Sequence, residues 1–164
     1  PKVCRAHIKE CISIIMNSEE ETLHQFIAKF KTDFIKLPFE DVAFPRGMNG
    51  MNKYRDRNTI YSKGTPIHVK GALLYNNLIH KRGLDTKYQL IGDGDKIRFA
   101  YLKLPNPLME HVISVPDDLP EELEFAKYID YDTQFNKSFL DPIKAIVEII
   151  GWDVEKRSTL ESFF

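Results

Sequence analysis

The chain has 164 residues, of which 43% are hydrophobic and 29% are charged, and its formal net charge is −1. This composition excludes a wholly disordered chain, and the length suits one domain with a sizeable core. No apolar run reaches the roughly 20 residues that a membrane span needs, and the opening stretch PKVCRAHIKE lacks the pattern of a secretory signal, so we expect an intracellular protein with no membrane partner.

The small net charge conceals an uneven distribution along the sequence. Between Pro45 and Leu84 eight lysine and arginine residues stand against one acid, Asp56, so this segment carries +7 and the rest of the chain −8. A strongly cationic element can therefore lie on an acidic body.

The first 37 residues predict two helices in an antiparallel hairpin. Residues 2–16 carry apolar side chains at helical spacing, and residues 23–37 continue with an aromatic stripe that Pro38 ends. Ser18 followed by three glutamates predicts a capping box at the start of the second helix. Cys4 and Cys11 share the apolar face of the first helix and are expected to be core thiols rather than a disulfide or a zinc site.

The middle of the chain predicts a long irregular loop, one helix and a small β element. Residues 38–65 carry several glycines and prolines and five of the eight basic residues of the cationic segment, and loops of this length are usually functional or disordered. A helix is expected from Pro66 to a left-handed cap at Gly83. A turn at residues 92–94 then leads into a strand, and residues 111–116 predict a second one.

From Pro120 the pattern is again helical. An apolar stripe runs from Phe135 to Ile150, Pro142 either kinks this helix or starts a new one capped by Asp141, and Gly151 closes it. The predicted fold class is α+β and predominantly α-helical, with a helical hairpin, further helices and a small antiparallel β element.

The start of the helix at Pro66 has the character of an anion site. Thr65 is the predicted N-cap, and the free N–H groups and dipole of a helix start favour negative charge. Lys63 and Gly64 would supply a cation and a closely approaching backbone. The alternative for an isolated K-G-T-P is an ordinary solvated helix cap.

Common catalytic signatures are absent from the sequence. It contains no phosphate loop, nucleophile elbow, H-E-x-x-H helix or G-x-G-x-x-G turn. The GDGD at 92–95 lacks the ligand series of an EF-hand and predicts a hairpin turn, while the acidic run 117–124 predicts a solvated helix start. We therefore predict no catalytic and no metal-ligating residues in this chain.

Five stretches together resemble a known family. They are FPRGMNG at 44–50, KGTPIHVKGALLYNN at 63–77, KYIDYDTQF at 127–135, SFLDPI at 138–143 and the aromatic peptide at the C-terminus. In this order they are similar to the C-terminal thumb of family B DNA polymerases of T-even-type phages, and the resemblance covers nearly the whole chain.

The resemblance implies a grip on the primer–template duplex, largely through its backbone and minor groove. The anion at the helix start would then be a DNA phosphate. The implied DNA-binding residues are Lys63, Gly64, Thr65, Pro66, His68 and Lys70, with Arg46, Asn49, Gly50 and Lys53 as second-rank candidates. A lysine at position 70 acts as a point charge and cannot make the bidentate contact of an arginine.

The resemblance also divides the chain into a thumb domain, 1–154, and a C-terminal tail, 155–164. In the tail Leu160, Phe163 and Phe164 match the spacing of peptides that bind a sliding clamp, although Arg157 stands where such peptides often have glutamine.

The implied function is a thumb subunit or fragment of a replicative polymerase, a nucleotidyltransferase of the infected bacterial cytoplasm. Its catalytic carboxylates and two Mg²⁺ ions would lie in the palm, on another chain or segment, and the polymerase core would comprise palm, fingers and exonuclease. A split polymerase gene is one origin, which Pro1 would suit if an initiator methionine had been removed; an excised fragment is the other. Two alternatives remain open: a free-standing nucleic-acid-binding or regulatory protein, and an unrelated enzyme.

Overall fold

The structure is a computed structural model that describes residues 1–55 and 59–156. The chain forms two compact units: unit 1 consists of Pro1–Leu37 and Tyr131–Phe164, and unit 2 is the intervening Pro38–Asp130. Helices predominate and the sheet has three antiparallel strands, so the predicted fold class is confirmed. No helix in the described ranges is long and apolar enough to cross a membrane.

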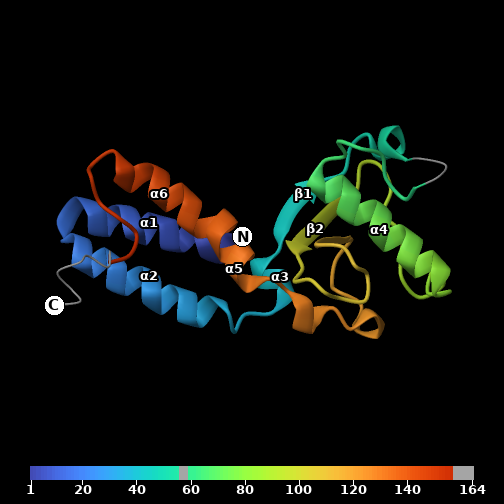
Figure 1. Ribbon diagram of the computed structural model, residues 1–164, viewed down its shortest axis with the longest axis horizontal. Coiled ribbons are helices and arrows are strands. Elements are labelled where there is room, and N and C mark those ends of the chain that lie inside the picture. The colour runs from blue at the N-terminus through green and yellow to red at the C-terminus, as the bar shows by residue number, and fades with distance from the viewer. Residues whose placement is uncertain (56–58, 157–164) are drawn as a thin grey trace. The chain divides into compact units, whose positions relative to one another are not determined.

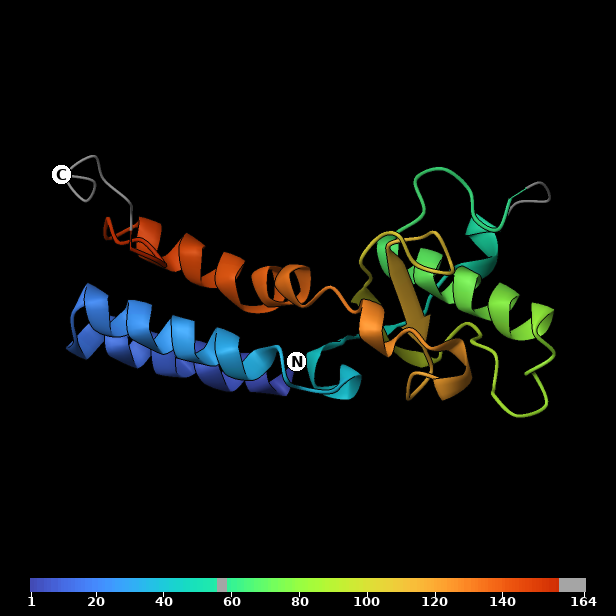
Figure 2. The ribbon, with the colours of Figure 1, turned by 60° about the horizontal axis from the view of Figure 1, so that its bottom comes forward.

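All regular secondary structure among the described residues of unit 1 is helical (Figures 1 and 2). The predicted hairpin is confirmed, because the first two helices contact each other, and the first also packs on the π-helical turn of the second half. The elements are α1 (Lys2–Asn17), α2 (Glu20–Phe34), α5 (Tyr131–Phe135), the π-helical turn η4 (Asn136–Leu140) and α6 (Asp141–Glu148).

The core of unit 1 is aromatic and joins its two halves. The ring of Phe30 on α2 lies edge-on to that of Phe139, with 4.8 Å between centroids, and the Phe34 and Phe135 rings lie 5.3 Å apart. Cys4 is also buried, and its thiol donates to Ser138 Oγ at 3.3 Å. Cys11 is buried too, and neither cysteine forms a disulfide, so the prediction of core thiols is confirmed.

The capping box predicted at Ser18 is wrong. The N–H of Ser18 donates to Ile14 O at 2.8 Å, so this residue ends α1, and α2 begins after Glu19 without a side-chain cap. Only two residues separate the helices, and Ser18 cannot terminate one and cap the other at once.

The second alternative for Pro142 is confirmed in part: α6 begins at Asp141 with Pro142 in its first turn, but the N-cap is Leu140 and not Asp141. Phe135, Leu140 and Asp141 all have right-handed helical backbone angles, so the chain stays helical from α5 through η4 into α6. The wider π turn stands directly before the proline, whose missing N–H and bulky ring disturb a regular α-helix. Asp141 makes no capping bond, whereas Gly151, at φ +76°, lies just beyond the helix end as predicted.

Unit 2 combines one long helix with the sheet, in the strand order β1-β2-β3. Its elements are α3 (Phe39–Val42), β1 (Phe44–Gly47), η1 (Met51–Tyr54), α4 (Ile67–Lys81), β2 (Lys96–Tyr101), β3 (Val112–Val115), η2 (Glu121–Leu123) and η3 (Ala126–Tyr128). The two predicted strands are confirmed. The prediction of an irregular 38–65 is wrong in part, because α3, β1 and η1 lie within it.

Helix α4 packs closely on the strand β3. Gly71 lies so near Ser114 that an added Cβ would stand 2.8 Å from the Ser114 nitrogen, and the Ser114 hydroxyl donates to His68 O at 2.8 Å. The register pairs Ser114 with Phe99, and Phe99 with Phe44, so these three side chains share the face that α4 covers.

The helix predicted to begin at Pro120 is wrong for its first eleven residues, 120–130. Two short 3₁₀ turns occupy this region, Glu124 between them adopts φ +54°, and Ile129 forms a β-bridge to Leu102. A left-handed residue cannot continue an α-helix, so regular helix starts only at Tyr131. The hydroxyl of Tyr131 donates to Leu37 O at 2.5 Å within unit 1.

Candidate nucleic-acid interface

The start of α4 differs by one residue from the prediction. Pro66 is the N-cap and Ile67 the first helical residue, while the Thr65 hydroxyl donates to Ser62 O at 2.6 Å instead of capping the helix. Thr65 as N-cap is therefore wrong, because its side chain stabilises the preceding turn. Among the residues that the structure describes, no side chain caps α4, which leaves the amides of its first turn available to solvent or to an anion.

Lys63 and Gly64 form an exposed turn directly before this helix end. Gly64 has φ +82°, a conformation that favours glycine, and no atom lies within 4 Å of where its Cβ would be. The N–H of Ser62 donates to Tyr54 O at 2.8 Å and thereby ties the turn to η1. Backbone and a cation are thus presented together at the predicted position.

Arg46 and His68 meet over the ring of Phe99. The Arg46 guanidinium lies 5.8 Å from the Phe99 ring centroid and the His68 ring 6.3 Å from it, so β1 and the start of α4 contribute to one surface. Burial, and secondarily the charge of Arg46, lowers the pKa of His68. His68 is accordingly neutral at pH 7 and can offer a hydrogen bond but no charge.

The remaining second-rank candidates, Lys53 in η1 and Asn49 and Gly50 directly before it, are all exposed. Asp93 accepts a hydrogen bond from the Met51 N–H at 2.8 Å and so holds this segment at the turn before β2. The GDGD forms a turn, as predicted, but not a hairpin turn, because the element before it in the described chain is α4 and not a strand. Within this turn the Asp95 carboxylate accepts the Gly92 N–H.

Lys70 has a different environment from Lys63. Its ammonium lies 3.1 Å from Glu110 Oε2 and 4.6 Å from the centre of the Tyr61 ring. Burial alone would lower the pKa of Lys70, but the hydrogen bonds and negative charge of Tyr61 and Glu110 outweigh it and raise that pKa. Glu110 and Tyr61 were not among the predicted site residues, because nothing in the local sequence links them to position 70.

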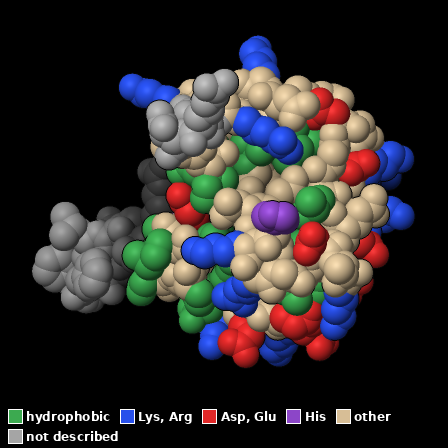
Figure 3. Space-filling view, turned by 90° about the vertical axis from the view of Figure 1, so that its right-hand side faces the viewer, with side chains coloured by type: hydrophobic (Ala, Val, Ile, Leu, Met, Phe, Trp, Pro, Cys, Tyr) green, Lys and Arg blue, Asp and Glu red, His purple; other side chains and the backbone are tan. Residues whose placement is uncertain are grey.

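Cations at both ends of α4 are only partly paired: near its start Lys70 pairs with Glu110, and near its end Lys81 and Arg82 make no ion pair within the described ranges. Beyond the C-terminal end, Lys87 pairs with Glu122 at 3.3 Å and Arg82 donates to the Glu122 carbonyl at 3.1 Å. Figure 3 shows basic and acidic side chains interspersed over the end face of unit 2. Near the N-terminal end, Arg46, Lys53 and Lys63 likewise make no ion pair within the described ranges.

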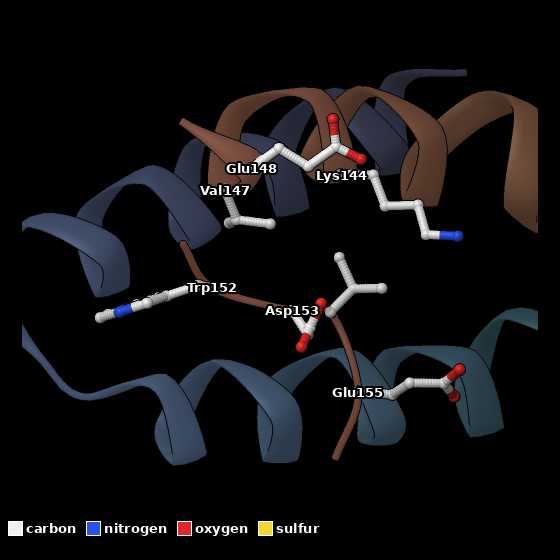
Figure 4. A pocket seen from close by; sticks show the side chains of 7 residues that line it. Lys144, Val147, Glu148, Trp152, Asp153 and Glu155 are labelled. Carbon is white, nitrogen blue, oxygen red and sulfur yellow. The ribbon is translucent and has the colours of Figure 1, made fainter. Parts of the chain in front are cut away.

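Two hollows lie among the described residues of unit 1. One of about 190 Å³ is lined by both charge signs, among them Lys144 and the acids Glu148 and Glu155 (Figure 4). The second, of about 150 Å³, lies between Ile27 on α2 and Leu140. Neither contains a predicted site residue, and no three His, Cys, Asp or Glu side chains converge as metal ligands in the part of the chain that the structure describes.

The predicted clamp-binding residues Leu160, Phe163 and Phe164, together with Arg157, lie outside the described residues. Their assignment stays a prediction from the sequence.

Comparison with known proteins places these features in context. No family model matches the chain. It is 28% identical over 168 residues to the DNA-directed DNA polymerase of Enterobacteria phage T4, and 27% identical over 169 residues to that of Escherichia phage RB69. Both alignments cover 100% of this chain but only 18% of the polymerase. The predicted resemblance is therefore confirmed: over its whole length, this chain is similar to one segment of the T-even-type phage DNA polymerases.

Proposed function

We propose that this chain is the thumb of a replicative family B DNA polymerase and grips the primer–template duplex. The observation that carries the proposal is the similarity to phage polymerases along 100% of the chain, on 18% of their length. A segment of 164 residues has the size of one domain of such a polymerase, and the thumb is the domain whose motifs this chain resembles.

The N-terminal end of α4 is the surface that we assign to the duplex. Lys63, Arg46 and Lys53 surround it without acidic partners in the described ranges, and Gly64 lets a backbone approach closely. Lysine and arginine contacts to phosphates release counterions and carry no base information. The grip would accordingly be sequence-independent and sensitive to salt, as a polymerase that moves along DNA requires.

Catalysis is assigned to the rest of the polymerase. The palm would hold the two Mg²⁺ ions and their carboxylates. The tail would add a tether, with Leu160, Phe163 and Phe164 binding a sliding clamp. A tether raises the effective concentration of a clamp that already encircles the DNA, so that even a weak peptide contact can matter.

The direct test is complementation of a polymerase core that lacks the matching segment. Adding the 164-residue chain should restore primer extension, and a variant with Lys63 and Arg46 both changed to alanine should restore less at higher salt. A chain that binds duplex DNA but neither associates with the core nor restores extension would favour the free-standing DNA-binding protein. A chain that neither binds duplex DNA nor restores extension would refute both the thumb and the free-standing DNA-binding protein.

A further inference from the structure

Three side chains from separate parts of unit 2, those of Tyr61, Lys70 and Glu110, contact one another. One carboxylate oxygen accepts the hydroxyl of Tyr61 at 2.9 Å, and the other lies 3.1 Å from the Lys70 ammonium. Lys70 also lies over the Tyr61 ring, at 4.6 Å from its centre. Each of the three therefore contacts the other two.

This cluster is sheltered from solvent, which makes its contacts effective. The side chains of Lys70 and Glu110 are only 15% and 24% exposed. Solvent screens such a pair less than an exposed one, and a phosphate that captured Lys70 would leave the Glu110 carboxylate without its cation. Lys63, which is exposed and has no such partner among the described residues, is the better phosphate ligand.

Glu110 is itself held by a rigid loop. The buried Asn106 side chain donates to Lys103 O and to Glu110 O, both at 2.8 Å, and accepts the Leu108 N–H at 2.9 Å. The backbone that carries Glu110 is thus fixed by an amide at the centre of the loop.

Tyr61 in turn belongs to the segment that carries the exposed cation. The next residue, Ser62, donates its N–H to Tyr54 O and accepts the Thr65 hydroxyl, so the turn at Lys63 and Gly64 lies between anchored residues. Lys70 is one helical turn beyond the start of α4, where the phosphate would bind. Glu110 therefore links the loop before the helix to the helix itself.

We infer that Glu110 is a positioning residue for the proposed duplex grip: it holds Tyr61 and Lys70 on its two carboxylate oxygens, and Lys70 supports the phosphate site without contacting a phosphate. This inference rests on the proposed function. It assigns the Lys63–Gly64 turn to the DNA and the Lys70–Glu110–Tyr61 cluster to the support of that turn.

The experiment measures affinity of the full chain for a short fluorescently labelled duplex, from about 50 to about 200 mM salt. Lys63→Met and Lys70→Met are matched variants, since each removes one lysine charge in the same way. Losing a phosphate contact makes the slope of log affinity against log salt shallower by about 0.9, and we expect this for Lys63→Met. We expect Lys70→Met to keep the slope and to lower affinity at every salt concentration.

The size of that loss follows from how often the turn keeps its shape. If the turn without its support adopts the binding geometry on the order of one tenth of the time, apparent affinity falls about tenfold. Tyr61→Phe, which changes no charge, should act in the same direction with an unchanged slope, and Lys70→Arg, which can still pair with Glu110, should retain most of the affinity. A Lys70→Met slope as shallow as that of Lys63→Met would overturn the inference, as would a Glu110→Gln variant with higher affinity and a steeper slope.

A second readout separates this inference from the proposed function. Hydrogen exchange of the Ser62 amide, measured without DNA, should be faster in Tyr61→Phe and Glu110→Gln while the melting temperature changes little. If wild type fails to bind DNA but this exchange accelerates, the proposed function fails and the support of the turn stands. If exchange is unchanged in both variants, the support is refuted whatever the DNA result.

Discussion

Replacing Gly71 with alanine should destabilise the chain, although alanine is the better helix former. An added Cβ would stand 2.8 Å from the Ser114 nitrogen and 3.1 Å from the Ile113 carbonyl carbon, and both are backbone atoms of a fully buried strand. Such overpacking costs about 1–3 kcal/mol, and disturbing the hydrogen bond from Ser114 to His68 O costs about 1 kcal/mol more. The helix gains about 1 kcal/mol from losing a glycine, so the net loss is about 2 kcal/mol.

Thermal unfolding followed by circular dichroism measures this loss. For a chain of this size 2 kcal/mol corresponds to a melting temperature lower by about 4–8 °C. Gly47→Ala is the matched control, because no atom lies within 4 Å of its Cβ position and its φ is not positive; we expect a change within about 0.5 kcal/mol. A Gly71→Ala variant that melts at or above the wild-type temperature would refute the close contact between α4 and β3.

Three further predictions concern charge, thiols and the tail. Arg46→Ala and Lys53→Ala should each make the slope of log affinity for duplex DNA against log salt shallower by about 0.9. Arg82→Ala should leave this slope unchanged, because Arg82 lies beyond the other end of α4, where it donates to Glu122 O. Equal slopes for all three variants would refute the assignment of the N-terminal end of α4 to the duplex. Burial raises the pKa of Cys4, and that of Cys11 to about 12, so both thiols stay protonated at pH 8 and should react with a thiol reagent only after unfolding, which a titration of the native chain checks. Deleting residues 160–164 should spare short-primer extension by the complemented polymerase and abolish stimulation by the clamp, while a lower melting temperature with stimulation intact would instead place these side chains in the chain's own core.

The elements that the sequence predicted well are those whose signal is local and repeated. In α1 and α2 several turns of apolar spacing specify both the helix and its buried face, and in β2 the alternation around Phe99 does the same for a strand. β1 was missed because its four residues, FPRG, contain a proline and a glycine, which are turn residues in most contexts. These residues form a strand because they pair with the edge of β2, and this pairing depends on the tertiary fold and not on the local sequence.

The site shows the same division. The exposed turn at Lys63 and Gly64 was predictable, since a glycine beside a helix start is a local signal. The partner of Lys70 was not, because Glu110 stands forty positions further on and only the packing of the 103–110 loop against α4 brings them together. A charge count over 45–84 treats these two lysines alike, although one is neutralised by a partner and the other is exposed.

The discontinuity of unit 1 determines the order in which the chain can fold during synthesis. Unit 2 is one continuous segment and emerges complete, whereas α1 and α2 must wait for α5 and α6 before their aromatic core closes. Both ends of unit 2 attach to its strand β2, through α3 and through the hydrogen bond from the Asp130 N–H to Tyr101 O. Once unit 2 has folded, it replaces a long flexible loop between the halves of unit 1 with a short span, which lowers the entropy cost of bringing them together. The α1–α2 hairpin therefore exposes its apolar face for a shorter time before α5 and α6 cover it. In this way the folding of unit 2 favours the folding of unit 1, into whose sequence it is inserted.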